Sequence, residues 1–156
     1  MQNIPYTLVM ADDDEDDRLL AQDAMEAAGI NYKCHTVNNG RELLDYLRNQ
    51  GVYANDKLNT LPRVILLDLN MPILDGRETL KELKTDPELS LIPVVVLSTS
   101  KNDFDVAESY RFGASSYLVK PTDFESMVEM MKSFSDYWFS KALVPEAVHL
   151  APVNKK

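Results

Sequence analysis

Residues 64–76 read VILLDLNMPILDG, an uninterrupted apolar run that stops at the carboxylate of Asp68. A short run of Val, Ile and Leu is typical of a strand that is buried on both faces of a parallel sheet. Burying an ionised carboxylate without partners is unfavourable. We therefore expect Asp68 to lie where the strand ends, at the rim of the sheet, where water, a metal ion or a ligand reaches it.

Four more segments have the composition of β-strands, at residues 7–11, 32–37, 94–97 and 116–119. Segments with the helical spacing of apolar residues alternate with the strands, at residues 16–28, 41–49, 76–84, 103–111 and 124–140. Strands that alternate with helices, several of them apolar throughout, indicate a parallel sheet covered on both faces. The sequence therefore predicts an α/β fold, a doubly wound five-stranded parallel sheet with helices on both faces.

The predicted helix at residues 124–140 has the clearest pattern. Thr122 and Glu125 have the spacing of a capping box at its start. An apolar stripe with Met and aromatic residues runs along it, which is typical of a helix that faces the core rather than of a cofactor pocket. The stripe consists of Phe124, Met127, Val128, Met131, Phe134 and Trp138.

Length and composition limit the class of protein. The chain of 156 residues, 45% apolar and 26% charged, predicts one soluble globular domain. No apolar stretch approaches the roughly 18 residues of a membrane span, and the N-terminus has no signal-peptide pattern, so we expect a cytoplasmic protein. A net charge of −9 argues against binding nucleic acid. Cys34 is the only cysteine, which excludes an internal disulfide.

Two polar segments lie outside the predicted elements. Residues 49–63, NQGVYANDKLNTLPR, are too polar for the core and are predicted to form an extended surface loop. Residues 141–156 contain prolines and a basic end, which indicates a loosely held C-terminal tail after a domain at residues 1–140. No second domain is expected.

The first predicted strand also ends in acids, in LVMADDDEDD at residues 8–17. Asp12 and Asp13 directly follow the strand and should project at the same rim as Asp68. The acids at 14–17 are interpreted as a solvated run at a helix start, where the helix dipole favours negative charge. Three carboxylates at one edge raise one another's pKa values, and a hard divalent cation removes that repulsion.

Mg²⁺ or Mn²⁺ is the expected cofactor, because such ions bind through one or two carboxylates, water and a phosphate. Asp13 and Asp68 suit this requirement, with a backbone carbonyl just after Asp68 as a third ligand. His35 and His149 stand alone in the sequence and are not expected to bind metal.

Polar groups also end two other predicted strands. The run VVVLSTS ends with the hydroxyl of Ser98, and SYLVKP ends with Lys120 and Pro121. Alone, a serine in this place is often a helix cap and a lysine is often solvated. Together with the carboxylates, they form the set that a bound metal and a phosphorylated carboxylate require.

The motifs ADDD, LLDLNMPILDG, VVVLSTS and GASSYLVKP, in this order and spacing, resemble those of the response regulator receiver domain of two-component systems, over about residues 6–138. The resemblance implies the flavodoxin-like, CheY-like fold with strand order 2-1-3-4-5. It also implies that Asp68 accepts a phosphoryl group from a phosphohistidine of a sensor histidine kinase, and that the chain is a phosphoprotein rather than a turnover enzyme.

The resemblance assigns a role to each motif residue. Mg²⁺ would bind to Asp13, Asp68 and the backbone carbonyl of Asn70, with Asp12 acting through water. The phosphoryl group would contact Lys120 and Ser98, and Ser98 and Tyr117 would form the conformational switch. Pro121 would follow Lys120 through a peptide bond that is usually cis in this family. Many members have Thr in place of Ser98, but the hydroxyl is kept.

Finer features resemble the stand-alone regulators that accompany phytochromes and related hybrid kinases. They are the segment at residues 49–63, DGRETL at residues 75–80 and SDYWFSK at residues 135–141. No output domain is expected after residue 140, so the signal would pass to a protein partner or, as a phosphorelay, to a histidine phosphotransfer protein. Large aromatic residues at 137–139 suggest a homodimer as a hypothesis.

Three other readings remain open at this point. A Mg²⁺-dependent phosphatase with an aspartyl nucleophile is one, although phosphatases of the haloacid dehalogenase type have a second Asp where this chain has Asn70. A flavin binder of the same fold is another, but DDDEDD would repel a phosphate. The third is a receiver that takes no phosphate and serves only as a docking surface.

Overall fold

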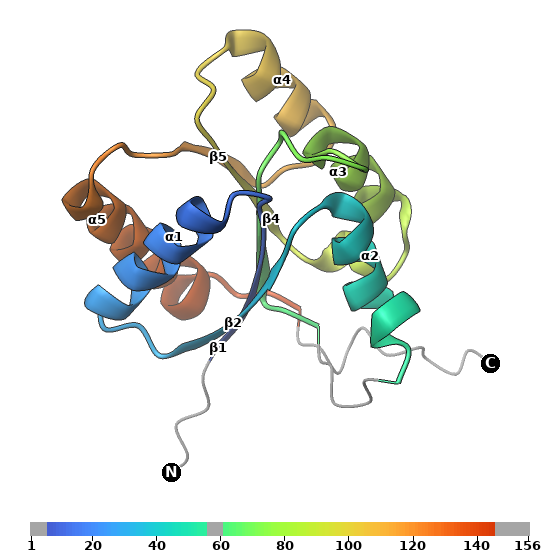
Figure 1. Ribbon diagram of the computed structural model, residues 1–156, viewed down its shortest axis with the longest axis horizontal. Helices are drawn as coiled ribbons and strands as arrows, with labels where there is room; N and C mark the ends of the chain where they lie inside the picture. Colours follow the sequence, from blue (N-terminus) through green and yellow to red (C-terminus); the bar gives the residue numbers. More distant parts are fainter. Residues whose placement is uncertain (1–5, 56–60, 146–156) are drawn as a thin grey trace.

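A computed structural model describes residues 6–55 and 61–145 of the protein (Figure 1). Five parallel strands form one sheet in the order β2-β1-β3-β4-β5, as predicted. The strands are β1 (Tyr6–Ala11), β2 (Tyr32–Val37), β3 (Val64–Leu67), β4 (Val94–Ser98) and β5 (Ser116–Val119). The α-helices are α1 (Glu15–Ala27), α2 (Gly40–Arg48), α3 (Gly76–Thr85), α4 (Asp103–Arg111) and α5 (Phe124–Ser135).

The core has two halves, one on each face of the sheet. Alternate residues of a strand face opposite sides, so Ile65 of β3 joins the half covered by α2 and α3 while Leu66 joins the half covered by α1 and α5 (Figure 1). Every residue of β3 and of β4 is buried. The uninterrupted apolar runs in the sequence therefore reflect strands that are covered on both faces.

Each α-helix begins after an Asp or Asn whose side-chain oxygen accepts a hydrogen bond from a backbone N–H of the first turn. These residues are Asp14, Asn39, Asp75, Asn102 and Asp123. These caps explain why α1 and α2 begin one residue before their predicted starts at residues 16 and 41.

The predicted capping box at Thr122 and Glu125 is wrong. Asp123 is the N-cap of α5 and accepts from the N–H of Ser126, because its carboxylate is the better acceptor and stands one residue nearer the helix. Most of the predicted apolar stripe faces the core, but Phe124 is 42% exposed because it lies in the first turn.

The segment at residues 49–63 is not simply an extended surface loop. It contains a 3-10 helix, η1 (Gly51–Tyr53), which packs on the sheet edge. The Tyr53 ring meets those of His35 and Tyr46 edge-on, and the Tyr53 hydroxyl lies 3.1 Å from Nε2 of His35. Apolar ring surface thus anchors a segment that looked too polar to be packed. Residues 56–60 lie outside the described residues.

The chain stays in contact with the domain beyond residue 140, where the sequence predicted a loosely held tail. Helix α5 continues directly into a π-helix, η3 (Asp136–Lys141). Elsewhere in the chain, a second short 3-10 helix, η2 (Leu89–Leu91), precedes β4. Arg63 donates to the carbonyl oxygens of Trp138 and Ala142 at 2.8 and 3.1 Å, and Val144 is buried. Ala142 and Val144 thus contact the rest of the domain, whereas Leu143 between them is 97% exposed. Residues 146–156 lie outside the described part.

Candidate functional site

Asp68 lies where β3 meets the loop that leads to α3. Its N–H donates to the carbonyl oxygen of Ala11 at the end of β1, at 2.9 Å. The N–H of Gly76 donates to the carbonyl oxygen of Leu69 at 2.8 Å, so α3 starts directly against the strand end. The side chain is therefore held by backbone contacts at the rim of the sheet, as expected from the sequence.

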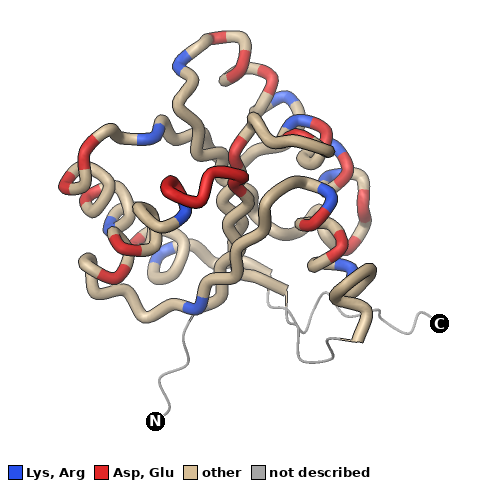
Figure 2. Tube along the Cα trace, viewed as in Figure 1, with Lys and Arg blue, Asp and Glu red and all other residues tan. Residues whose placement is uncertain are grey.

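Three carboxylates meet at this rim. Because β1 and β3 are parallel neighbours with Ala11 opposite Leu67, the residues that follow these strands lie side by side. Carboxylate oxygens of Asp12, Asp13 and Asp68 lie within 4.8 Å of one another. Figure 2 shows the acidic stretch that continues from the end of β1 into the first turn of α1. The sequence prediction that these three side chains come together is consistent with this geometry.

Asp68 is buried, and its side chain is 11% exposed. Burial raises its pKa; the charge of Lys120 lowers the pKa, while the charges of Asp12 and Asp13 raise it further, to a value of about 6. The site thus holds its acids close together in spite of their repulsion. An arrangement of this kind is favourable when a cation is shared between the oxygens.

Lys120 lies immediately after β5, and its side chain, which is 9% exposed, crosses to the acids. Its Nζ donates to carboxylate oxygens of Asp12 and Asp17, both at 2.8 Å, and lies 3.9 Å from Oδ1 of Asp68. Burial alone lowers the pKa of Lys120, but the hydrogen bonds to Asp12 and Asp17 outweigh it and leave the pKa above its ordinary value. The ammonium is therefore charged and directed at the carboxylates.

The interpretation of Asp17 as a merely solvated helix-start acid is wrong, because its carboxylate contacts the Lys120 ammonium. Asp13 lies before the N-cap Asp14 and outside α1, so no helical spacing relates it to Asp17, and no local pattern pointed to the contact with Lys120. Asp12 also differs from a simple water-bound acid, since it accepts from Lys120 and, at 2.9 Å, from the N–H of Asp14.

Ser98 ends β4 and is fully buried, at 0% exposed. Its carbonyl oxygen accepts from the N–H of Lys120 at 2.8 Å, and its Oγ accepts from the N–H of Ser100 at 3.1 Å. Tyr117 of β5 is partly buried, and its hydroxyl donates to the carbonyl oxygen of Ser100 at 2.8 Å. Sequence reasoning missed Ser100, which is bonded to both predicted switch residues.

Asn70 and Pro121 complete the predicted set. Asn70 is exposed in the loop after β3, two residues beyond Asp68. The peptide bond between Lys120 and Pro121 is trans, so the expected cis bond is a correction. The trans form is the lower-energy isomer of an X–Pro bond by about 0.5–1 kcal/mol.

Residues 8–132 match the family model of the response regulator receiver domain. The chain belongs to this family. One relative, the response regulator Rcp1 of Synechocystis sp., is 34% identical to this receiver over 145 residues, which cover 93% of this chain and 97% of Rcp1.

Two solved structures resemble this receiver over most of its length. The phosphorylated cyanobacterial phytochrome response regulator RcpA is 38% identical with a TM-score of 0.84, covering 92% of this chain and 100% of RcpA. The Mn²⁺-bound form of Rcp1 is 34% identical with a TM-score of 0.80, covering 90% and 99% of the two chains. This receiver is thus close to the stand-alone, phytochrome-associated response regulators.

Receivers bind a divalent metal ion in an acidic pocket, and the donor set of this receiver fits such an ion. The three carboxylates supply hard oxygen ligands from two adjacent strand ends, one of them exposed enough for water to reach it. No helix within residues 6–55 and 61–145 combines the length and apolar character that crossing a membrane requires.

Proposed function

We propose that this receiver accepts a phosphoryl group on Asp68 from the phosphohistidine of a sensor histidine kinase, and signals through a changed surface to a protein partner. The observation that carries the proposal is the position of the Asp68 carboxylate. It lies among the oxygens of Asp12 and Asp13 and 3.9 Å from the Lys120 ammonium. This is the setting that a carboxylate nucleophile for phosphorus needs.

In the transfer step, a carboxylate oxygen of Asp68 attacks phosphorus. The new P–O bond forms as the P–N bond to the imidazole breaks, and the imidazole keeps the electron pair and takes a proton. Lys120 would exchange part of its contact with the acids for a phosphoryl oxygen. Such transfer depends mainly on positioning and on charge stabilisation, both of which the held side chains supply.

The carboxylates of Asp13 and Asp68 and the backbone carbonyl of Asn70 would hold Mg²⁺, or Mn²⁺, with Asp12 acting through a bound water. When bound, the cation supplies positive charge that offsets the carboxylates and the phosphoryl oxygens. The Mn²⁺-bound form of Rcp1, a similar receiver, supports a divalent ion in this place.

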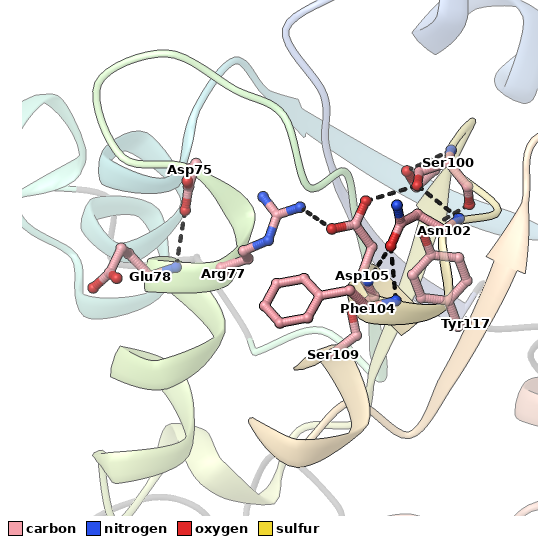
Figure 3. Close-up of polar contacts among 10 residues, drawn as sticks. Asp75, Arg77, Glu78, Ser100, Asn102, Phe104, Asp105, Ser109 and Tyr117 are labelled. Atoms are coloured by element: carbon pink, nitrogen blue, oxygen red, sulfur yellow. Dashed lines mark hydrogen bonds and ion pairs between the residues drawn. The ribbon is translucent and has the colours of Figure 1, made fainter. Parts of the chain in front are cut away.

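After transfer, the hydroxyl of Ser98 would donate to a phosphoryl oxygen and Tyr117 would move inward. A phosphoryl group brings charge and three acceptor oxygens, so it favours the loop arrangement that presents donors to them. In the present structure the Tyr117 ring packs against the core half covered by α2 and α3, and its hydroxyl donates to the carbonyl oxygen of Ser100 (Figure 3). The surface formed by α4, β5 and α5 is where the change would be read.

The proposed kinase is of the phytochrome-associated type, which the likeness to RcpA supports. Onward transfer to a histidine phosphotransfer protein is the alternative output. The phosphatase alternative is disfavoured because Asn70 cannot serve as an acid or base. The division into residues 1–140 and a tail at 141–156 stays a prediction.

The test of the proposed function is covalent labelling. The purified chain, incubated with acetyl phosphate and Mg²⁺, should gain one phosphoryl group, and peptide mass spectrometry should map it to Asp68. Phosphotransfer from purified sensor kinases then identifies the partner. A chain that stays unlabelled with acetyl phosphate and with every kinase would leave only the docking-surface reading.

Divalent metal should stabilise the folded chain, because an ion that binds only the folded state adds free energy of unfolding. At ten times its dissociation constant the gain is about 1.4 kcal/mol. Asp13→Asn should remove most of this gain, whereas Asp16→Asn, an exposed acid of the same run, should keep it. Urea unfolding with Mg²⁺ and with EDTA measures the effect. Equal Mg²⁺ stabilisation of all three proteins would contradict the assignment of Asp13.

A homodimer remains a hypothesis for residues 137–139. Phe139 is buried in the core, but Tyr137 is 54% exposed. Tyr137 and Trp138 border a hollow of about 710 Å³ between β5 and the end of α5, with Leu118, Met130 and Phe134 in its wall. Sedimentation should show a dimer at high concentration that Tyr137→Ser weakens. Only monomer, with and without a phosphate mimic, would remove the hypothesis.

A further inference from the structure

Asp17 differs from the acids that precede it at the start of α1. The three residues Asp14, Glu15 and Asp16 are exposed. Asp17 is partly buried, and its Oδ2 accepts from Nζ of Lys120 at 2.8 Å. The helix dipole favours an acid at this place, but it does not account for a partner at the end of β5. The contact therefore links α1 to the strand end that carries Lys120.

Lys120 is bonded to two carboxylates and stops short of a third. Its Nζ donates to Asp12 and Asp17 at 2.8 Å each. Oδ1 of Asp68 lies 3.9 Å from Nζ, which is too far for a hydrogen bond. An ammonium has three N–H donors, so one is left for a further acceptor. The ammonium thus faces the Asp68 carboxylate without being bonded to it.

Packing does not by itself fix this ammonium. A cavity of about 70 Å³ lies beside the Lys120 side chain, lined from α1 by Asp17 and Leu20 and from α5 by Met127. A lysine has a flexible four-carbon stem, and beside open space it can adopt more than one position. The place of the ammonium therefore depends on the carboxylates that hold it.

The two carboxylates that hold Lys120 are themselves fixed at the start of α1. Asp17 belongs to the first turn of this helix. The backbone N–H of Asp14 donates to Oδ1 of Asp12 at 2.9 Å, and Nη1 of Arg18 donates to the carbonyl oxygen of Asp12 at 2.6 Å. Lys120 is thus positioned by a frame formed by α1 and the end of β1.

We propose that Asp17 is a positioning residue for phosphorylation: it holds the Lys120 ammonium where a phosphoryl oxygen on Asp68 meets it, and keeps it from pairing with Asp68 itself. The inference rests on the proposed phosphorylation of Asp68. Without Asp17, the Asp68 carboxylate is the neighbour that Nζ is not yet bonded to. A movement of about 1 Å would bring Nζ from 3.9 Å into hydrogen-bond range of that carboxylate.

An ion pair between Lys120 and Asp68 would slow the reaction. It would occupy an oxygen of the nucleophile, and the ammonium would have to move again during transfer, whereas a preorganised charge need not move. Loss of Asp17 should therefore slow labelling. Removal of a negative charge alone should leave labelling unchanged or speed it, because acetyl phosphate is an anion. The sign of the effect thus separates positioning from plain charge.

The experiment measures the initial rate at which acetyl phosphate with Mg²⁺ labels the full chain, by mass spectrometry of the intact protein. Asp17→Asn should label about threefold to tenfold more slowly than the unaltered chain, since one stabilising charge is displaced. Asp17→Glu keeps the carboxylate and should recover part of the rate. Asp16→Asn is the matched control: it removes the same charge from an exposed neighbour and should label at the unaltered rate or faster.

Double variants with Lys120→Met show whether Asp17 acts through Lys120. In this background Asp17→Asn should slow labelling no further, because the ammonium that Asp17 positions is gone. Urea unfolding in EDTA gives a readout without metal. There the two substitutions should be non-additive by about twofold to fivefold in the unfolding equilibrium constant, whereas Asp16→Asn and Lys120→Met should be additive.

Labelling of Asp17→Asn at or above the rate of Asp16→Asn overturns the inference. Equal slowing by Asp17→Asn with and without Lys120, or additive effects of Asp17→Asn and Lys120→Met on unfolding, overturns it as well. Each of these results leaves Asp68 as the acceptor, because the unaltered chain still takes label. An unaltered chain that takes no label from acetyl phosphate or from any kinase overturns the proposed function and this inference together.

Discussion

Asp68→Asn is expected to abolish labelling of the chain by acetyl phosphate. An amide has no ionised oxygen to attack phosphorus, so no acyl phosphate forms at this position. The neighbouring acids should not replace it, because Asp12 is bonded to Lys120 and Asp13 is exposed beyond the buried pocket. Labelling should fall to the level without acetyl phosphate, as measured by mass spectrometry of the intact protein.

Asp14→Asn is the control for this substitution. It makes the same chemical change in the same acidic run, and Asn caps a helix about as well as Asp. This variant should label as the unaltered chain does. Residual label in Asp68→Asn that hydroxylamine removes would identify another carboxylate as acceptor, and label that resists hydroxylamine would identify a hydroxyl such as that of Ser98.

Asp68→Asn should not unfold the chain when no divalent metal is present. The folded-state pKa of Asp68, about 6, lies above its ordinary value of 3.8, so the folded state binds this proton more strongly than the unfolded state does. Stability is therefore lost as pH rises through this window, and the loss is complete above it. A neutral amide avoids the loss, so at neutral pH the melting temperature in EDTA should be equal or higher.

Gly76→Ala is expected to damage both stability and labelling. A Cβ at Gly76 would lie 2.3 Å from the carbonyl oxygen of Asp68 and 2.7 Å from Cα of Leu69. Both are backbone atoms that cannot rotate away, so α3 must move from the strand end. We expect a loss of about 2–3 kcal/mol in the free energy of unfolding. Labelling by acetyl phosphate should slow by about a hundredfold, since misplacing a reacting group by 1 Å has effects of this size.

Gly29→Ala separates the two effects. Gly29 has φ of 75° and nothing within 4 Å of an added Cβ, so only backbone strain is introduced. This variant should lose about 1–2 kcal/mol and label at the normal rate. Urea unfolding and the initial labelling rate measure both quantities. Normal labelling by folded Gly76→Ala would show that the contact with Asp68 does not position the acceptor.

The main features of the site could be predicted because a parallel sheet follows a simple rule. Uninterrupted apolar runs identify strands covered on both faces, and the residues that end them meet at one edge. Asp12, Asp13, Asp68 and Lys120 were found in this way, and their oxygens and ammonium do lie together. Short-range patterns failed where two acceptors competed, as at Asp123, which caps α5 in place of Thr122.

The order of residues along the chain is enough to specify the sheet, its strand ends and the polar groups gathered there. Local patterns of apolar and polar residues identify the strands, and a parallel sheet brings the carboxyl ends of its strands to one edge. The order of residues does not reveal that Asp17 contacts Lys120, 103 residues away, or that Arg77 reaches Asp105 across 28 residues and Asp105 in turn holds Ser100. Those partners depend on how helices pack beside the sheet. Packing is settled by side-chain shape and burial over the whole molecule, which no local pattern records.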